Sequence, residues 1–381
     1  MKILHVAPEL FPNAGGVTNV CTNQAKELVN RGHSVTIVCS DYSFSEDLMN
    51  ELKHAGVPVI PFRSVISLRC FFYTPSFVQW IKDHLSEFDV VHLHDFRSYQ
   101  NIIICKNARR LGIPVVLQAH GTLLNRPPNS FPKTMFDLTW KERIVNTVDK
   151  FIVLTQADRE DHLKFGIPAD KLVMLPNGIN LSEYKNLPEK GRFRKKYSVP
   201  DNCFIILYIG RLHTTKGIDF LIQSFMKLVA DHPRYKLVLI GPDSGYLESI
   251  SDEVKRLIDL KDIILTGPKY GEEKIEALVD ADVFVLPSTN EVFGISVLEA
   301  WACGTPSIIT TGCGLSTEPH IAGIVIERNE PALVAAILSI TAKEKEISAS
   351  NGKNIVKDIY NWEKIVMNLE AIYSSFYKGV K

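Results

Sequence analysis

The sequence predicts an α/β protein of two domains, each built on a parallel sheet with helices on both faces. Three observations lead to this expectation. Short apolar runs typical of strands alternate with amphipathic helical patterns along the whole chain. Several of these runs are continuously apolar, as expected for strands that are covered on both sides. The length of 381 residues is too great for one ordinary core and suits two domains.

The strand-like runs form two groups on either side of a charged stretch. They span residues 2–7, 34–39, 90–93, 114–117 and 150–154, and then 203–209, 236–240, 262–265, 282–286 and 306–310. Apolar side chains between them repeat at helical spacing, as from Val17 to Leu28 and from Ile218 to Val229. Strands that alternate with helices in this way predict parallel sheets.

The polar stretch Asn186–Asp201 marks the expected domain boundary, because it places Pro and Gly among a cluster of Lys and Arg. We therefore expect one domain over residues 1–187 and another over residues 188–361. The last helical pattern, from Trp362 to Phe376, carries an apolar face that needs a surface on which to pack.

The composition excludes several classes of protein. Lys plus Arg number 43 and Asp plus Glu also number 43, so no net charge attracts nucleic acid. The seven scattered cysteines contain no CxxC pair, which favours reduced thiols in the cytoplasm over a disulfide framework or a zinc site. The apolar start of the chain is too short for a signal peptide, and no run approaches the ~20 residues needed to cross a bilayer.

Two turns that follow strands suggest phosphate binding. Gly15 and Gly16 open a helix after the first strand, where backbone N–H groups can approach an anion, although an ordinary tight turn explains two glycines equally well. The loop GRLHTTKG after strand 203–209 carries Arg211 and Lys216 at the end of a strand where α/β proteins bind ligands. We favour phosphate contacts over two solvated charges, because Arg can fork onto phosphate oxygens while Lys adds a point charge.

A third loop, after strand 282–286, connects two glutamates through the start of a helix. Phe293, Gly294 and Ile295 would present free helix N–H groups to a diphosphate. Glu299 lies a turn deeper and could accept hydrogen bonds from the two hydroxyls of a ribose. A solvated role would suit Glu291 but not Glu299, which apolar residues flank.

Five motifs in order give the chain a resemblance to glycosyltransferase family 4, a large group of retaining enzymes with the GT-B fold. They are GGV at 15–17, HGT at 120–122, PNGI at 176–179, GRLxxxKG at 210–217 and E-x7-E at 291–299. The likeness covers nearly the whole chain. It implies two Rossmann-like domains whose sheets face each other across a cleft, with the final helix, 362–381, joining the first domain.

The resemblance implies transfer of a sugar from a nucleotide diphosphate sugar to an acceptor hydroxyl, with no metal or other cofactor. The acceptor would be a glycan, lipid-linked or part of a cell envelope. Arg211 and Lys216 would bind the diphosphate and balance the charge of the leaving group. Glu299 would hold the ribose, and Glu291 would lie near the transferred sugar.

The first domain would contribute to the same reaction. By the resemblance, Gly15 and Gly16 would approach the donor, and His120 would lie close to the anomeric carbon. The expected catalytic residues are therefore His120, Arg211, Lys216 and Glu291. Asp95, at the end of strand 90–93, and Asn177 of the PNGI motif are candidates for the acceptor side.

Two patterns that could suggest a metal do not lead us to expect one. Asp280 and Asp282 spell the DxD motif of metal-dependent glycosyltransferases, but they straddle a helix end and a strand start, so we expect them to face solvent or cap the helix. His92 and His94 would share one face of a strand, yet the sequence shows no further group of ligands beside them.

Other functions remain open at this point. A nucleotide-sugar epimerase of GT-B fold would share the donor site but need no acceptor. A non-catalytic subunit that only binds the donor is a second alternative, although the complete set of expected site residues weighs against it. A nicotinamide dehydrogenase fits less well, because the glycine fingerprint GxGxxG is incomplete.

Two aromatic and basic stretches suggest that the first domain touches the inner face of a membrane, where rings enter the headgroup layer and cations meet anionic lipid. The first carries Phe62, Arg63, Arg69, Phe71, Phe72, Tyr73, Phe77 and Trp80, and the second carries Arg126, Phe131, Lys133, Phe136 and Trp140. The same aromatic residues could equally be core. The sequence therefore predicts a cytoplasmic protein and leaves its contact with the membrane as a hypothesis.

Overall fold

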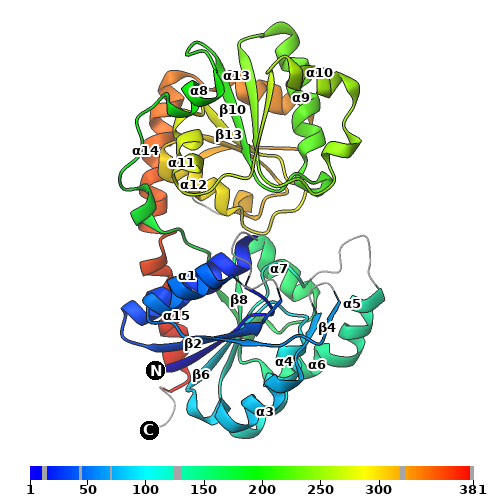
Figure 1. The fold of residues 1–381 in the computed structure, drawn as a ribbon, viewed down its shortest axis with the longest axis vertical. Coiled ribbons are helices and arrows are strands. Elements are labelled where there is room, and N and C mark those ends of the chain that lie inside the picture. Colours follow the sequence, from blue (N-terminus) through cyan, green and yellow to red (C-terminus); the bar gives the residue numbers. More distant parts are fainter. Residues whose placement is uncertain (11–14, 43–44, 69–70, 124–130, 318–321, 378–381) are drawn as a thin grey trace. The chain divides into compact units, whose positions relative to one another are not determined.

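The computed structural model describes residues 1–10, 15–42, 45–68, 71–123, 131–317 and 322–377. The chain forms two compact units, one of Met1–Asn177 with Trp362–Lys381 and one of Gly178–Asn361 (Figure 1). The predicted boundary at 187/188 lies within the second unit. The reason is that the segment before it already packs there, since Tyr184 is buried and hydrogen-bonds to Glu299.

The first unit is built on a seven-stranded parallel sheet with the order β3-β2-β1-β6-β7-β8-β9. Its strands are β1 (Lys2–Val6), β2 (Ser34–Ser40), β3 (Val59–Phe62), β6 (Val90–His94), β7 (Val115–Gln118), β8 (Lys150–Val153) and β9 (Leu172–Met174). A separate antiparallel hairpin pairs β4 (Ile66–Leu68) with β5 (Phe71–Tyr73).

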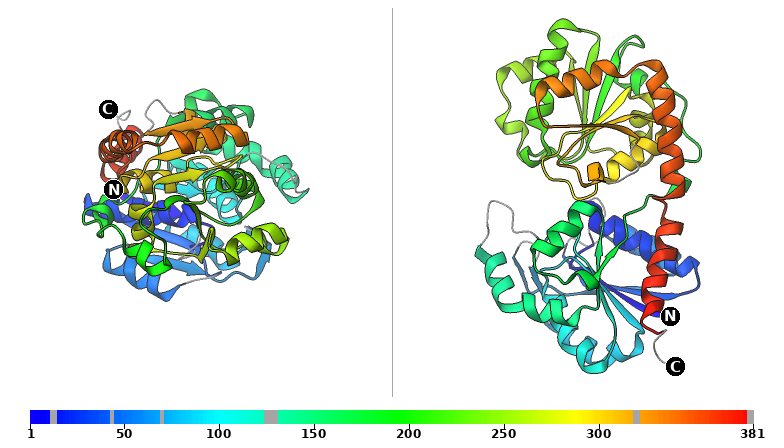
Figure 2. Two further views of the ribbon diagram at one scale, coloured as in Figure 1. Left: turned by 90° about the horizontal axis from the view of Figure 1, so that it is seen from above. Right: turned by 180° about the vertical axis from the view of Figure 1, so that it is seen from behind.

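Helices lie on both faces of this sheet (Figure 2). They are α1 (Gly15–Asn30), α2 (Glu46–His54), α3 (Pro75–His84), α4 (Tyr99–Leu111), α5 (Phe131–Phe136), α6 (Glu142–Thr147), α7 (Gln156–Lys164) and α15 (Trp362–Ser375). A π-helical turn, Asp137–Lys141, joins α5 to α6. The last helix, α15, packs against α1 and buries the apolar face that the sequence predicted, including Trp362, Val366 and Tyr373.

The second unit has a six-stranded parallel sheet with the order β12-β11-β10-β13-β14-β15. The strands are β10 (Phe204–Ile209), β11 (Tyr235–Ile240), β12 (Ile263–Gly267), β13 (Val283–Leu286), β14 (Ser307–Thr310) and β15 (Gly323–Ile326). The helices are α8 (Arg192–Tyr197), α9 (Ile218–Asp231), α10 (Asp252–Asp259), α11 (Gly271–Asp280), α12 (Ile295–Cys303), α13 (Glu330–Ser339) and α14 (Ala342–Asp358).

All ten predicted strands are present, within one or two residues at their ends, and the predicted fold class is confirmed. The strands that the sequence did not reveal within the parallel sheets are β3, β9 and β15, and each lies at a sheet edge. Edge strands are short and need no continuous apolar run, and β3 even contains Pro61, which is tolerated where a ladder hydrogen bond is not required.

The order of strands is the same in principle in both sheets. Each begins at its centre, builds outward in one direction for three strands, and then returns to the centre and builds the other way. The direction reverses between β1 and β6 in the first unit and between β10 and β13 in the second. Ligands of open α/β sheets bind at such switch points, beside the carboxyl ends of the strands.

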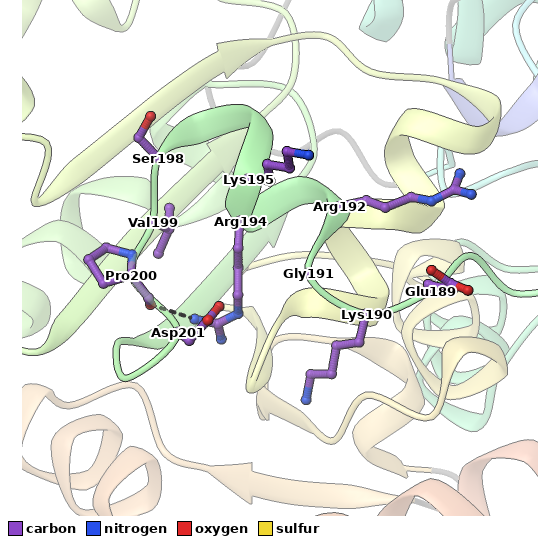
Figure 3. Close-up of a pocket in the computed structure, with 10 residues that line it drawn as sticks. All are labelled: Glu189, Lys190, Gly191, Arg192, Arg194, Lys195, Ser198, Val199, Pro200 and Asp201. Atoms are coloured by element: carbon purple, nitrogen blue, oxygen red, sulfur yellow. Dashed lines mark hydrogen bonds between the residues drawn. The ribbon is translucent and has the colours of Figure 1, made fainter.

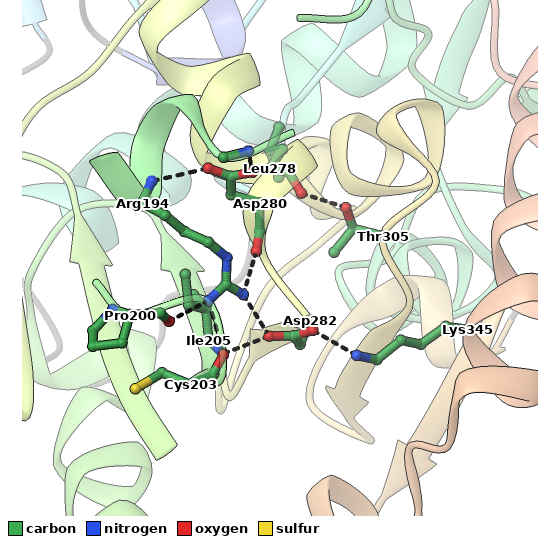
Figure 4. A network of polar contacts seen from close by, with 10 residues as sticks. Arg194, Pro200, Cys203, Ile205, Leu278, Asp280, Asp282, Thr305 and Lys345 are labelled. Atoms are coloured by element: carbon green, nitrogen blue, oxygen red, sulfur yellow. Dashed lines mark hydrogen bonds and ion pairs between the residues drawn. The ribbon is translucent and has the colours of Figure 1, made fainter. Parts of the chain in front are cut away.

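The DxD sequence has a structural role that corrects part of the prediction. Asp280 and Asp282 are buried rather than solvent-facing, with 1% and 9% of their surface exposed. Asp280 does cap a helix, but the helix is α8 rather than its own, because its carboxylate accepts the backbone N–H groups of Gly191 at 2.5 Å and Arg194 at 2.9 Å. Asp282 pairs with the Arg194 guanidinium at 3.0 Å and with Lys345 at 2.5 Å (Figure 4).

This network predicts that the second unit depends on Asp282 for stability. Asp282→Asn would leave the buried Arg194 without its carboxylate, and losing one partner of a buried pair costs about 3–5 kcal/mol. Urea unfolding, followed by tryptophan fluorescence, should show a clearly lower midpoint. The control is Asp252→Asn, which removes an exposed pair with Lys255 and should leave the midpoint unchanged. Equal midpoints for the two variants would contradict the assignment.

Candidate active site

In the second unit, two loops meet at the switch point through their backbones. The first follows β10 and runs from Gly210 to Gly217, and the second follows β13. Gly217 has a φ of 74°, and a Cβ atom there would lie only 2.0 Å from the carbonyl oxygen of Pro287. Only glycine allows this approach. The two loops are also joined by the Thr289 hydroxyl, which donates to the carbonyl oxygen of Thr215 at 3.1 Å.

The contact between these loops brings two of the predicted residues together. The Lys216 ammonium lies 2.5 Å from the Glu291 carboxylate, and both side chains are partly buried. Arg211 is exposed at the start of its loop, where the Tyr208 hydroxyl donates to its carbonyl oxygen at 3.0 Å. The sequence predicted that these residues lie on loops after two strands, but it did not predict that Lys216 and Glu291 pair.

The helix that follows, α12, begins where the sequence predicted an anion site. Gly294 caps it with a φ of 82°, in a space where a Cβ atom would meet Leu286 and Cys313 at 3.0 and 3.2 Å. Ile295 opens the first turn, where the Val297 N–H donates to the carbonyl oxygen of Gly294 at 2.9 Å. The N–H groups of Ile295 and Ser296, at the very start of the helix, suit an anion. The side chain of Phe293 is core, packed edge-on against Tyr360 at 5.8 Å, so only its backbone can face a ligand.

Glu299 lies one turn into α12 and is held by two residues that the sequence did not suggest. Its carboxylate pairs with Lys274 at 2.7 Å, and the Tyr184 hydroxyl hydrogen-bonds to it. Burial lowers the pKa of Lys274, but the charge and hydrogen bond of Glu299, together with the charge of Glu183, hold that pKa above its usual value. Burial and the same carboxylate raise the pKa of Tyr184. The carboxylate is therefore fixed in place by these two partners.

The loop after β14 braces Glu291 from the other side. The Glu291 N–H donates to the carbonyl oxygen of Gly312 at 2.9 Å, and the Gly314 N–H donates to the carbonyl oxygen of Glu291 at 2.6 Å. A Cβ atom on Gly312 would lie 2.5 Å from the carbonyl oxygen of Ser288. In the sequence this loop is marked only by the pair of glycines around Cys313.

A hollow elsewhere on the second unit contains none of the predicted site residues. It lies beside α8 (Figure 3) and is lined by Glu189, Lys190, Gly191, Arg192, Arg194, Lys195, Ser198, Val199, Pro200 and Asp201. The guanidinium of Arg194 is already engaged by Asp282 and by backbone carbonyl groups. We therefore assign the candidate site to the switch point and not to this hollow.

In the first unit, two predicted residues have left-handed backbone conformations at strand ends. Asp95 follows β6 with a φ of 70°, and His120 follows β7 with a φ of 51°. Such conformations are costly for residues other than glycine and gather at functional sites. The Asp95 carboxylate accepts the N–H of Phe96 at 2.6 Å and the hydroxyl of Thr122 at 2.5 Å, so the two loops are linked.

Four histidine rings gather beneath these loops. His92 and His94 share a strand face, as predicted, and their rings stack at 4.5 Å. His94 hydrogen-bonds to His120 and also to His5 of β1, each at 3.0 Å, while His92 bonds to the Tyr373 hydroxyl at 2.7 Å. Burial lowers the pKa of His5 to about 3, and lowers that of His120 to about 4 against a weaker opposing effect from Asp158. Burial likewise lowers the pKa values of His92 and His94, so all four rings are neutral at pH 7.

The sequence missed three residues in this region, which are His5, Cys21 and Glu9. Cys21 of α1 lies 3.8 Å from the Nδ1 atom of His5, so ligand-type atoms of His5, Cys21 and His94 lie within 4.8 Å of one another. Glu9 follows β1, and burial together with the charge of Asp95 raises its pKa to about 7. The only signal for Glu9 was its position in the turn that follows the first strand.

The remaining predicted residues occupy different environments. Gly15 begins α1 and Gly16 is exposed beside it, at the start of the helix that follows β1. Asn177 is 4% exposed, and its side-chain oxygen accepts a hydrogen bond from Gln118 at 3.1 Å. Its amide is thus committed to a buried contact, and a role toward an acceptor stays a prediction.

Known proteins resemble this chain over its whole length. A glycosyltransferase of Methanocaldococcus jannaschii, described as uncharacterized, is 28% identical and matches 98% of both chains. A D-inositol 3-phosphate glycosyltransferase of Geodermatophilus obscurus is 24% identical over 98% of this chain and 88% of its own. The crystal structure of Anabaena HepE in complex with UDP and glucose superposes with a TM-score of 0.80, covering 98% of this chain and all of the other at 20% identity.

Family models divide the chain in the same way as the two sheets. Residues 14–183 match the model described as Glycosyltransferase Family 4, and residues 189–357 match Glycosyl transferases group 1. With the fold of GT-B glycosyltransferases in both units, the chain belongs to this family of glycosyltransferases. None of the helices in the described part of the chain combines the length and apolar character needed to span a bilayer.

The paired loops predict that Arg211 and Lys216 are needed for turnover. Replacing either with Ala removes a positioned cation and should reduce kcat by about a hundredfold to a thousandfold. The fold should survive, since both residues lie on a loop. Lys227→Ala, which removes an exposed cation paired with Glu330, is the control and should keep normal turnover. Near-normal kcat for Lys216→Ala with saturating donor would show that the ammonium has no such role.

Proposed function

We propose that the protein transfers a sugar from a UDP-sugar to the hydroxyl of a glycan acceptor, with retention of configuration. The observation that carries the proposal is the meeting of Lys216, Glu291 and the start of α12 at the switch point of the second unit. It supports a site for a diphosphate flanked by a carboxylate. The choice of uridine draws on Anabaena HepE, whose structures contain UDP, UDP with glucose, or UDP-glucose.

In the proposed reaction, the bond between the sugar and the diphosphate breaks as negative charge grows on the diphosphate. Arg211, Lys216 and the N–H groups at the start of α12 stabilise that charge, which is usually the largest contribution in such sites. Glu299 holds the ribose hydroxyls, and its pairing with Lys274 keeps its carboxylate in position. The acceptor hydroxyl attacks the same face of the sugar, and an oxygen of the leaving phosphate takes its proton.

The first unit supplies the acceptor side of the proposed reaction. Asp95 and Glu9 both follow central strands of the first unit, and burial together with the charge of Asp95 raises the pKa of Glu9. Carboxyl groups are good acceptors for sugar hydroxyls. His120, held in a left-handed conformation at the adjacent loop, would contact the transferred sugar.

Product analysis tests the proposal against its alternatives. Thermal shifts with UDP-, GDP- and ADP-sugars should show the largest stabilisation for a UDP-sugar, because a ligand at a hundred times its Kd stabilises by ~2.7 kcal/mol. Release of UDP should then require an added acceptor. Epimerised sugar formed without an acceptor would indicate an epimerase, and binding without turnover over a broad acceptor panel would favour a donor-binding subunit.

We also propose that catalysis needs no metal. The carboxylates of the DxD sequence form ion pairs with Arg194 and Lys345 and accept hydrogen bonds from backbone N–H groups. These contacts support a structural role for both residues. Turnover should therefore persist after exhaustive treatment with EDTA and removal of the chelator. Loss of activity with recovery on adding Mn²⁺ would overturn this proposal. A sample treated with EDTA already saturated with Mg²⁺ controls for effects of the chelator itself.

A contact with the membrane is proposed for α5 and the turn after it. Phe131, Met135 and Leu138 are 76%, 45% and 78% exposed, and their spacing places them on one side of the helix. We call these three residues the α5 stripe. Asp137 lies between them and is held by the Arg97 guanidinium at 2.6 Å, so the helix is anchored to the unit while the stripe stays exposed.

The other aromatic residues of the hypothesis are mostly core. Phe62, Phe72 and Phe77 are buried, and Phe136 and Trp140 pack against the core of the first unit. Arg69 and Arg126 lie outside the described residues. The proposed contact therefore rests on the α5 stripe with the exposed Lys133 beside it. In the stretch from 61 to 80, Arg63 and Tyr73 are exposed, but the other described aromatic residues are buried or partly buried.

Flotation with vesicles tests the contact. The protein should float with vesicles that contain anionic lipid and less well as salt rises, because Lys133 adds an electrostatic attraction to the apolar one. Leu138→Asp should abolish flotation. Ile347→Asp changes an exposed apolar residue of α14 in the second unit and should have no effect. Equal flotation of both variants would exclude the α5 stripe as the contact.

A further inference from the structure

Three imidazole rings form a continuous hydrogen-bonded chain that ends at His120. His5 Nδ1 lies 3.0 Å from His94 Nε2, and His94 Nδ1 lies 3.0 Å from His120 Nε2. The rings of His94 and His120 are nearly parallel, at 17°. His5 and His94 are completely buried, whereas His120 is partly exposed on its loop. This hydrogen-bonded chain of rings thus leads from the core of the first unit to a residue of the candidate site.

Neutrality of the rings makes the two hydrogen bonds depend on each other. A neutral imidazole has one N–H group and one lone pair. His94 uses both of its nitrogen atoms in the chain, so it must donate to one neighbour and accept from the other. Only two arrangements are possible. Either every N–H points outward from His5 to His120, or every N–H points inward from His120 to His5.

The surroundings of His5 favour the outward direction. Its Nε2 atom is buried without a hydrogen-bond partner. In the inward direction this atom would be an N–H group with no acceptor, which is rarer in protein cores than an unpaired acceptor. The Cys21 sulfur, 3.8 Å from His5 Nδ1, adds to this preference. An Nδ1–H group can be shared with that sulfur, whereas a single lone pair would have to accept from both the thiol and His94.

We infer that His5 and His94 are positioning residues that lock His120 as a hydrogen-bond donor through its Nδ1–H group. In the outward direction His94 donates to His120 Nε2, so the proton of His120 must reside on Nδ1. That group can donate to an oxygen of the ligand. His120 then has no free lone pair and cannot act as a general base. The inference deepens the proposed function, because it assigns His120 to binding an oxygen of the transferred sugar.

A bound metal ion is the competing explanation for the same atoms. His5, Cys21 and His94 offer three ligand atoms within 4.8 Å of one another. A metal there would use His5 Nδ1 and His94 Nε2 as ligands, and the hydrogen bond between these atoms could not exist. The chain of hydrogen bonds already accounts for their 3.0 Å separation. Metal content is therefore one arm of the test.

The state of His120 can be measured in the unmodified protein without any substrate. Long-range ¹H–¹⁵N correlation spectra of protein labelled at its histidines distinguish the two neutral tautomers from the imidazolium. A His120→Gln variant assigns the signal. We expect His120, His94 and His5 all to carry their proton on Nδ1 at neutral pH. This measurement does not depend on transferase activity, so it stands even if the proposed function fails.

Variants of His94 test the consequence for turnover. His94→Phe removes both hydrogen bonds of the middle ring and so disconnects His120 from His5. It should lower kcat by about tenfold, which is the effect of one well-placed hydrogen bond, with a smaller change in KM. His94→Gln keeps a donor and an acceptor and should recover most of the loss. The matched control is His92→Phe, because His92 is equally buried on the same strand and stacks on His94, but its hydrogen bond goes to Tyr373.

Four outcomes would overturn the inference. They are an Nε2–H tautomer for His120, a charged imidazolium in the chain at neutral pH, a stoichiometric transition metal in the purified protein, or equal kcat for His94→Phe and His92→Phe. If His94→Phe does not fold, the tautomers of the unmodified protein still decide the matter. Thermal unfolding of both Phe variants separates a loss of stability from a loss of positioning.

Discussion

The handedness of the connections between parallel strands is the constraint on which both candidate sites depend. Crossovers between parallel strands are almost always right-handed. Where the chain leaves two neighbouring central strands in opposite directions, a crevice opens at the carboxyl ends of those strands. In the first unit this happens between β1 and β6, and in the second between β10 and β13. Gly16, Asp95 and His120 lie near the first of these points, and Lys216 and Glu291 at the second. Residues far apart in the sequence are thus brought to one edge by topology alone.

The polar groups buried at these edges differ between the two units. In the second unit, charges are kept and paired, as in Lys216 with Glu291 and Lys274 with Glu299. Each pair limits the cost of desolvation and also fixes the position of its members. In the first unit, burial keeps the imidazoles of His5 and His94 neutral, and hydrogen bonds replace ion pairs. In the proposed function, the charged edge would bind the diphosphate and the neutral edge would bind the hydroxyl groups of sugars.

Close approach of backbones holds the loops of the second unit in place. Gly217 lies against Pro287, and Gly312 lies against Ser288, at distances that a side chain would prevent. These contacts tie the loops after β10, β13 and β14 to one another. The positions of Lys216 and Glu291 are consequently set by the backbone, and the side chains need only extend from it. The sequence displays the glycines but not the residues they contact. Pro287 lies 70 residues after Gly217, and Ser288 lies 24 residues before Gly312.

The sequence by itself determined the fold class, the central strands and the loops that carry Arg211, Lys216, Glu291 and Glu299. These features depend on local patterns, such as continuous apolar runs, glycine turns and helical spacing. Tertiary structure alone decided which groups pair. It placed Asp282 on Arg194, Lys274 on Glu299 and His94 between His5 and His120. It also divided the aromatic residues into core and exposed stripe. Pairing and burial are set by contacts between distant segments, and no local pattern records them.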